Sequence, residues 1–94
     1  MDLEWDEDKR QDTISRRGLD FADLLDVDLE SLRTWPDERQ NYGEVRLISY
    51  AYLHGRLCTF CWTRRDNRLR IISMRKANER ECKRYEAGED PRHA

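Results

Sequence analysis

The stretch VRLISYAYLHGRLCTFCWTRRDNRLRIISM, residues 45–74, decides the fold. Three apolar segments make it up, at residues 45–53, 56–65 and 68–74. They are rich in aliphatic, aromatic and β-branched side chains, which favour β-strands. The connectors His54-Gly55 and Asp66-Asn67 are two residues long and consist of residue types typical of tight hairpins. The pattern predicts three antiparallel strands joined as a meander.

The middle segment, RLCTFCWTRR, is apolar on both faces of the predicted strand. Leu57 and Cys61 fall on one face, and Cys58, Phe60 and Trp62 fall on the other. A strand of this kind is normally covered on both sides, so we expect it to lie at the centre of the sheet.

Cys58-x-x-Cys61 has the spacing of some metal and redox motifs. Positions three apart in a regular strand point to opposite faces, so these two thiols are not expected to chelate together. His54 and His93 stand alone and provide no second pair at zinc spacing. We therefore interpret all three cysteines, Cys82 included, as reduced structural thiols.

The residues before the meander predict short helices. After an extended start at 3–5, Asp6 is positioned to cap a helix through about Arg17, with Gly18 as its stop. Apolar residues at the i, i+3, i+4 spacing predict a second short helix over 20–25. Residues 29–35 are expected to form a weak strand, and the polar stretch PDERQNYGE, residues 36–44, a loop.

Asn78 and Glu81 match a capping box, which predicts a helix that ends near Gly88. Residues 89–94 are expected to be a frayed tail. Together these segments predict one α+β domain over residues 1–94. It has short N-terminal helices, an antiparallel β-meander sheet of three to four strands and a C-terminal helix.

The net charge of −2 conceals two halves of opposite sign. Residues 1–44 hold 6 Lys and Arg against 14 Asp and Glu, whereas residues 45–94 hold 12 against 6. A basic half suits a polyanion such as RNA. The alternative is that the two halves neutralise each other on folding.

The chain has no apolar run near the roughly 18 residues that a membrane span requires, and its N-terminus, MDLEWDEDKR, is acidic where a signal peptide is basic and then apolar. The sequence therefore predicts a cytoplasmic protein without membrane association.

Several short motifs, in this order, resemble those of the BrnT toxins. They are Leu3-Glu4-Trp5-Asp6 with Lys9, then Gly18-Leu19-Asp20-Phe21, then Gly43-Glu44-x-Arg46, and then Arg70-Ile71-Ile72-Ser73-x-Arg75-x-Ala77 with Glu81 and Tyr85. The resemblance covers roughly residues 3–86. It implies a RelE-like fold and a ribonuclease that arrests translation. Because the sequence holds no metal-ligand cluster, we expect this enzyme to act without a metal or other cofactor. The resemblance also implies a cognate antitoxin of ribbon-helix-helix type, bound in a hetero-oligomer.

The sequence departs from the resemblance at three positions. The family commonly has Asn, His and Glu where this chain has Thr13, Arg17 and Arg64. His and Glu are side chains that readily move protons near neutral pH. Either these positions are not essential, or the protein is a weakened nuclease.

RNA cleavage without a metal requires cations for the phosphate and groups that move protons. Arg65, Arg70 and Arg75 are the phosphate-binding candidates, because guanidinium groups match phosphate bidentately. The alternative for each is an ion pair with the acidic half. Lys9 and Glu44 are candidates for proton transfer or transition-state support, against the alternative, for Lys9, of a solvated helix lysine.

Three further residues are candidates for RNA contact. Arg46 belongs to the Gly43-Glu44-x-Arg46 motif, and Trp5 and Tyr85 have rings that can stack on bases. For both rings the alternative is packing, which we favour for Tyr85.

Two functions follow from the sequence. The first is a metal-independent endoribonuclease that cleaves single-stranded or ribosome-associated mRNA and is silenced by its antitoxin. The second is a catalytically weakened homologue that binds RNA or an antitoxin and represses its own operon.

Overall fold

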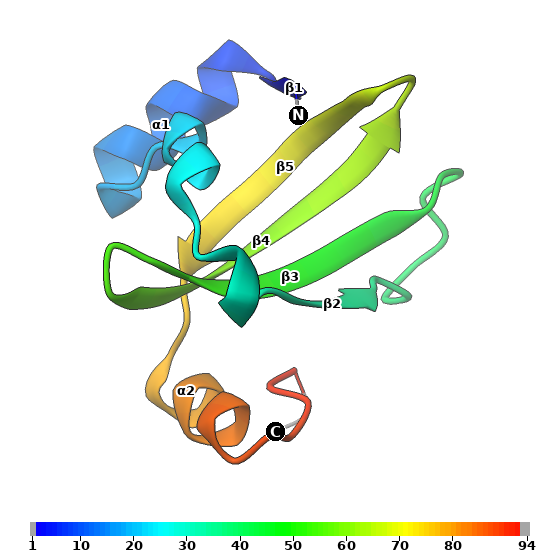
Figure 1. The fold of residues 1–94 in the computed structure, drawn as a ribbon. Coiled ribbons are helices and arrows are strands. Elements are labelled where there is room, and N and C mark those ends of the chain that lie inside the picture. Colours follow the sequence, from blue (N-terminus) through cyan, green and yellow to red (C-terminus); the bar gives the residue numbers. More distant parts are fainter. Residues whose placement is uncertain (1, 93–94) are drawn as a thin grey trace.

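A computed structural model describes residues 2–92, in which five strands form one mixed sheet (Figure 1). Across the sheet the order is β1-β5-β4-β3-β2. The strands are β1 (Asp2–Trp5), β2 (Arg33–Pro36), β3 (Arg46–Leu53), β4 (Arg56–Arg65) and β5 (Arg68–Lys76). The central strand is β4, as the sequence predicted.

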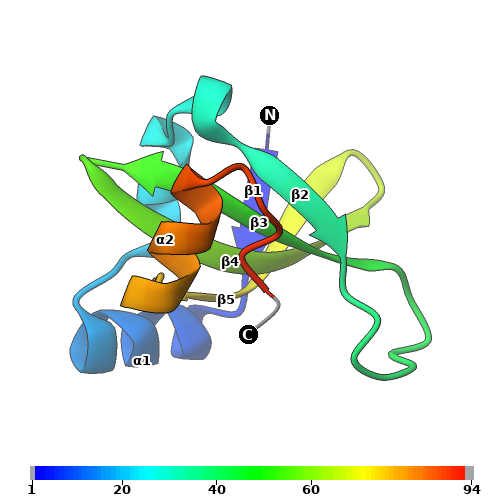
Figure 2. The same ribbon diagram turned by 90° about the horizontal axis from the view of Figure 1, so that it is seen from below.

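Helical segments cover the sheet on different sides (Figures 1 and 2). These segments are α1 (Glu7–Arg17), the 3-10 helices η1 (Phe21–Asp26) and η2 (Leu29–Ser31), and α2 (Glu79–Glu86). Residues of η1 pack with Cys58, Phe60 and Trp62 in one core cluster, whereas α2 packs with Leu57 and Tyr50 in another. The predicted division of β4 into two apolar faces is confirmed.

Local signals in the sequence set the helix ends. The Asp6 carboxylate accepts from the backbone N–H groups of Asp8 and Lys9, and Gly18 ends α1 with a left-handed φ of 67°. In α2 the capping box of Asn78 and Glu81 is present, as predicted. Among the described residues, neither helix has the length and apolar character needed to cross a membrane.

The two predicted hairpins are also confirmed. His54 and Gly55 both have positive φ, 49° and 79°, as a primed two-residue turn requires. Strand β5 continues to Lys76, two residues beyond the predicted end. Its pairing with β4 shifts between Cys61 and Trp62, and Ile72 is the extra residue of this bulge.

The prediction for the sheet was wrong in the number of strands and in their all-antiparallel arrangement. It has five strands rather than three or four, because residues 2–5 pair in parallel with β5, from Asp2 opposite Arg68 to Trp5 opposite Ile71. The strand predicted over 29–35 begins only at Arg33, since residues 29–31 form η2 under the Asp28 cap.

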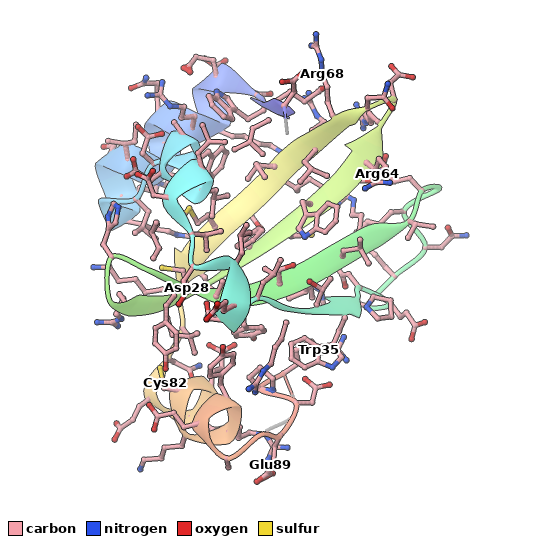
Figure 3. All side chains as sticks on the ribbon, viewed as in Figure 1. Asp28, Trp35, Arg64, Arg68, Cys82 and Glu89 are labelled. Atoms are coloured by element: carbon pink, nitrogen blue, oxygen red, sulfur yellow. The ribbon has the colours of Figure 1, made fainter. Side chains whose placement is uncertain are left out.

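The prediction of a frayed tail was wrong for residues 89–92. Pro91 is buried, and the Arg92 guanidinium donates to the Pro36 carbonyl at 2.7 Å. Arg92 also lies 5.4 Å from the ring centre of Trp35, which points from β2 toward this C-terminal segment (Figure 3). These contacts fix the segment against the sheet edge. Residues 93–94 of the predicted tail lie outside the described residues.

Candidate nucleic-acid interface

The face of the sheet that packs against α2 is only partly covered by that helix. Its open part forms a groove of about 630 Å³. We call this space the groove; its lining includes the arginines Arg17, Arg39, Arg75 and Arg92, the acidic residues Asp37, Glu38 and Glu81, and Ile48, Tyr50, Thr59, Phe60, Cys61 and Ser73. Four guanidinium groups on one concave surface make it the strongest candidate for binding a polyanion.

Strand register explains why these residues lie together. Arg75 pairs with Thr59, which pairs with Tyr50, so the three form one row across β5, β4 and β3. Cross-strand partners project to the same face, which places the Arg75 side chain beside Tyr50. The next row of the same face holds Ser73, Cys61 and Ile48.

Arg75 is held in place by a carboxylate of α2. Its two terminal nitrogens donate to the two oxygens of Glu81 at 2.8 and 2.9 Å. The same carboxylate accepts from the hydroxyl of Tyr50 and from the backbone N–H of Asn78. The Glu81 side chain is 9% exposed, whereas the Arg75 side chain is 46% exposed. A buried anion thus fixes a guanidinium that still faces solvent.

The pKa values in this cluster follow from its contacts. Burial alone raises the pKa of Glu81, but hydrogen bonds from Arg75, Tyr50 and Asn78 outweigh it and lower the pKa to about 2. Burial, and then the hydrogen bond to Glu81, raise the pKa of Tyr50 to about 12. Glu81 is therefore a fixed anion near neutral pH, and Tyr50 stays protonated.

A second carboxylate–arginine pair lies in the loop after β2. Arg39 donates to both oxygens of Asp37, from Nε at 2.8 Å and from Nη2 at 2.7 Å. The Asp37 side chain has no exposed surface, whereas that of Arg39 is 69% exposed. Hydrogen bonds from Arg39 lower the pKa of Asp37 to about 2.

A third row holds two of the predicted site residues, Arg70 and Arg46, and two more, Glu44 and Arg65, are linked to Arg46 by ion pairs. Arg70 pairs with Thr63, which pairs with Arg46, on the face that holds the groove. Ion pairs link Arg70 to Glu4 at 2.8 Å, Arg46 to Glu44 at 3.2 Å and Arg65 to Glu44 at 3.3 Å. Each of these pairs joins the acidic and basic halves of the chain, so part of the opposite charge is neutralised on folding. This row lies about 13 Å from the Arg75 row, four residues along β4.

The other predicted site residues lie elsewhere. Lys9 is exposed on α1, beside a second depression of about 400 Å³ that shares Arg17 and Ser73 with the groove. Trp5 packs edge-to-face on Phe21, on the opposite side of the sheet. Tyr85 is buried against Tyr52, and its hydroxyl donates to the Ser31 carbonyl at 2.5 Å.

The three departures from the resemblance occupy separate environments. The Thr13 hydroxyl donates to the Lys9 carbonyl within α1. Arg17 donates to the Met74 carbonyl of β5 at 2.6 Å and lines the groove. Arg64 lies at the end of β4 that is remote from α2, opposite Leu69 (Figure 3). Met74 and Leu69 are five residues apart on β5, so Arg17 and Arg64 do not share one site.

Cys58 and Cys61 point to opposite faces, as expected: Cys58 is in the η1 core cluster and Cys61 lines the groove. Burial is the main cause that raises the pKa of each thiol. Among residues 2–92, no group of three His, Cys, Asp or Glu side chains is placed to hold a metal ion.

Sequence reasoning missed Asp37, Arg39, Tyr50 and Arg92 as residues of the groove. Tyr50 lies in a predicted strand, where alternation indicates a buried ring rather than a site. Arg39 lies in a loop without apolar period, and Arg92 lies in the segment predicted to fray. The only local signal is the spacing of Asp37 and Arg39, which allows two side chains in a turn to meet.

Comparison with known proteins identifies the family. The sequence profile of the family described as the ribonuclease toxin, BrnT, of type II toxin–antitoxin systems matches residues 5–81. No curated protein sequence matches the chain. The matched segment includes α1, strands β2 to β5, only the last residue of β1, and the start of α2 up to Glu81. With most of its length covered by the profile, the chain belongs to the BrnT family of ribonuclease toxins of type II toxin–antitoxin systems.

Proposed function

We propose that this toxin cleaves RNA in the groove without a metal ion, by attack of a ribose 2′-hydroxyl on the adjacent phosphate. The observation that carries the proposal is Arg75, which is fixed bidentately by buried Glu81 and remains 46% exposed. Preorganised cations aimed at developing charge supply the largest share of stabilisation in many enzymes. Arginines provide that charge here with no need for a cation cofactor.

The remaining predicted residues have roles that suit their places. Arg46, Arg65 and Arg70 are proposed to hold the RNA backbone beyond the groove, where their ion pairs with Glu44 and Glu4 leave donors available. Lys9 and Glu44 stay candidates for proton transfer. Burial raises the pKa of Glu44, but hydrogen bonds from Arg46 and Arg65 outweigh it, so the pKa is lowered. A lowered pKa favours charge support over action as a base. Trp5 and Tyr85 are less favoured as RNA contacts, because both pack on neighbouring rings.

The test is cleavage of RNA by the pure protein in excess EDTA, with analysis of the product ends. We expect cleavage to persist, and the upstream products to end in a 2′,3′-cyclic phosphate, because the attacking group is the ribose hydroxyl. Activity that returns only on addition of a divalent cation, or products with simple 3′-hydroxyl ends, would contradict the mechanism.

Toxins of type II systems have an antitoxin partner, and we propose one of ribbon-helix-helix type that covers the groove in a hetero-oligomer. RNA cleavage by the free toxin would then arrest translation in the cytoplasm. The combination of short N-terminal helices, a sheet with an antiparallel meander and a C-terminal helix supports a RelE-like classification. A neighbouring reading frame for a small ribbon-helix-helix protein is the simplest check on the partner.

A second candidate function is supported by the acid–base chemistry of the groove. The pKa values of Asp37 and Glu81 are about 2 and that of Tyr50 is about 12, so these three groups are poor proton carriers at neutral pH. A weakened homologue that binds RNA or antitoxin and regulates its operon would retain such a groove. RNA binding without any cleavage or toxicity would favour this function over the first.

A further inference from the structure

The groove contains two arginines that are held in the same way. Arg75 is fixed by Glu81 of α2, and Arg39 is fixed by Asp37 of the loop between β2 and β3. In both pairs the carboxylate is buried, with side-chain exposures of 9% and 0%, and the guanidinium is exposed at 46% and 69%. The two pairs come from unconnected elements and line one concave surface.

From this arrangement we propose that Arg39 and Arg75 form a clamp for the phosphodiester backbone of single-stranded RNA, with Arg39 as a phosphate-binding residue. The proposal rests on the proposed ribonuclease function and adds to it a second, preorganised contact.

The anchoring carboxylates orient the guanidinium groups without using all of their donors. A guanidinium has five N–H donors, and Asp37 takes one from Nε and one from Nη2 of Arg39. Three donors remain on the exposed side of Arg39, in a planar arrangement that matches two phosphate oxygens. Because the side chain is already held, less conformational entropy is lost when the phosphate binds.

A purely structural role would require Arg39 only to satisfy Asp37. That carboxylate has other partners, since the Tyr42 hydroxyl donates to it at 3.2 Å and the Arg39 backbone N–H at 3.3 Å. Asp37 therefore does not depend on the Arg39 guanidinium alone, and the Arg39 side chain is 69% exposed and lines the groove. The pair therefore presents a cation to the groove.

The experiment measures binding of a 2′-O-methyl RNA oligonucleotide, which lacks the attacking hydroxyl, by fluorescence anisotropy at several salt concentrations. The variants are Arg39→Ala, Arg75→Ala as the other half of the clamp, and Arg56→Ala as a charge-matched control from the β3–β4 hairpin. For Arg39→Ala we expect Kd to rise on the order of 10-fold and the slope of log K against log salt to flatten by about 0.7. Arg56→Ala should change neither quantity appreciably.

Arg39→Ala leaves Asp37 buried without its main partner, so the variant can lose its fold. Asp37→Asn combined with Arg39→Ala removes both charges and avoids that penalty. We expect the same loss of affinity and slope in this double variant, with circular dichroism reporting an intact fold. Folded variants that bind RNA with wild-type affinity and slope would overturn the clamp while leaving the ribonuclease proposal in place. A wild-type protein that neither binds nor cleaves RNA would overturn both.

Discussion

At the scale of single residues, the site is built from arginines whose orientation is set by buried carboxylates. The sequence identified Arg75 and Glu81 through the same family motif, but it did not predict that they pair, because the only structural role assigned to Glu81 was in the capping box. The structure gives Glu81 both roles: it accepts from the backbone of Asn78 and holds the guanidinium of Arg75. One side chain thus couples the start of α2 to the groove.

This coupling makes Arg75 more than a surface cation. We expect Arg75→Ala to lower cleavage by roughly 10² to 10³-fold, the usual effect of losing one transition-state donor. It should also lower the free energy of unfolding by about 1–3 kcal/mol, because Glu81 loses two hydrogen bonds while it remains buried. Steady-state kinetics with urea unfolding checks both effects.

Two further variants separate the effect of Arg75→Ala on cleavage from its effect on stability. The double variant Arg75→Ala with Glu81→Gln should regain part of the free energy of unfolding that Arg75→Ala loses, and its cleavage rate should remain low. Arg70→Ala should cost less than about 1 kcal/mol, since its ion pair with Glu4 is partly exposed. If the double variant recovered wild-type cleavage, Arg75 would not be a transition-state contact.

The two buried carboxylates predict a particular acid response. Both Asp37 and Glu81 have pKa values of about 2, below their ordinary values of 3.8 and 4.5. A lowered pKa in the folded state contributes stability that is fully present above the ordinary pKa and is lost as pH falls toward 2. We expect the Tm to fall over this range, and Glu81→Gln to make that fall shallower. The exposed Glu86→Gln is the matched control; an unchanged pH profile for Glu81→Gln would contradict the assignment.

At the scale of elements, the positions of α1 and β4 place Arg17 and Arg64 far apart. These are the two positions where the family commonly has the proton-moving residues His and Glu. Arg17 at the end of α1 reaches the groove, whereas Arg64 lies near the far end of β4. Alternation along β4 places Arg64 with Phe60 and Trp62, on the face opposite Cys61. The two side chains belong to different surfaces.

This separation predicts that the departures have unequal effects. We expect Arg17→His to raise cleavage by 10-fold or more, because an imidazole beside the groove can move protons near neutral pH. Arg64→Glu should leave the rate within about two-fold, as a single charge change outside the groove. Single-turnover cleavage by each variant distinguishes them. An increase from Arg64→Glu alone would place a functional surface on the other face.

The elements also show which signals in the sequence were sufficient. The meander, the capped α1 and the capped α2 each have strong local signals, and each forms as predicted. The extended conformation of residues 3–5 was predicted, but their place in the sheet as strand β1 was missed, because the parallel pairing with β5 is a contact between distant parts of the chain. The fixed conformation of residues 89–92 likewise depends on contacts with Pro36 and Trp35, and no local sequence pattern reveals these contacts.

At the scale of the whole molecule, the family and the general fold class were accessible from sequence, but the site was only partly so. Motifs supplied Arg46, Arg70 and Arg75, and strand register then arranged them on one face. Arg39 and Arg92 come from segments without periodic pattern, so only the folded structure brings them to the groove. The opposite charges of the two halves are also partly neutralised by ion pairs between them, which a count of charges does not reveal.

The central claim is that RNA binds in the groove, and an NMR titration tests it most directly. Amide shifts of the isotope-labelled toxin would be followed as 2′-O-methyl RNA is added. We predict that the largest changes fall on Cys61, Ser73 and Arg75 and on the loop around Arg39, with smaller ones around Arg70. Changes that instead gather on η1 and the exposed face of α1, with the groove amides unmoved, would contradict the account.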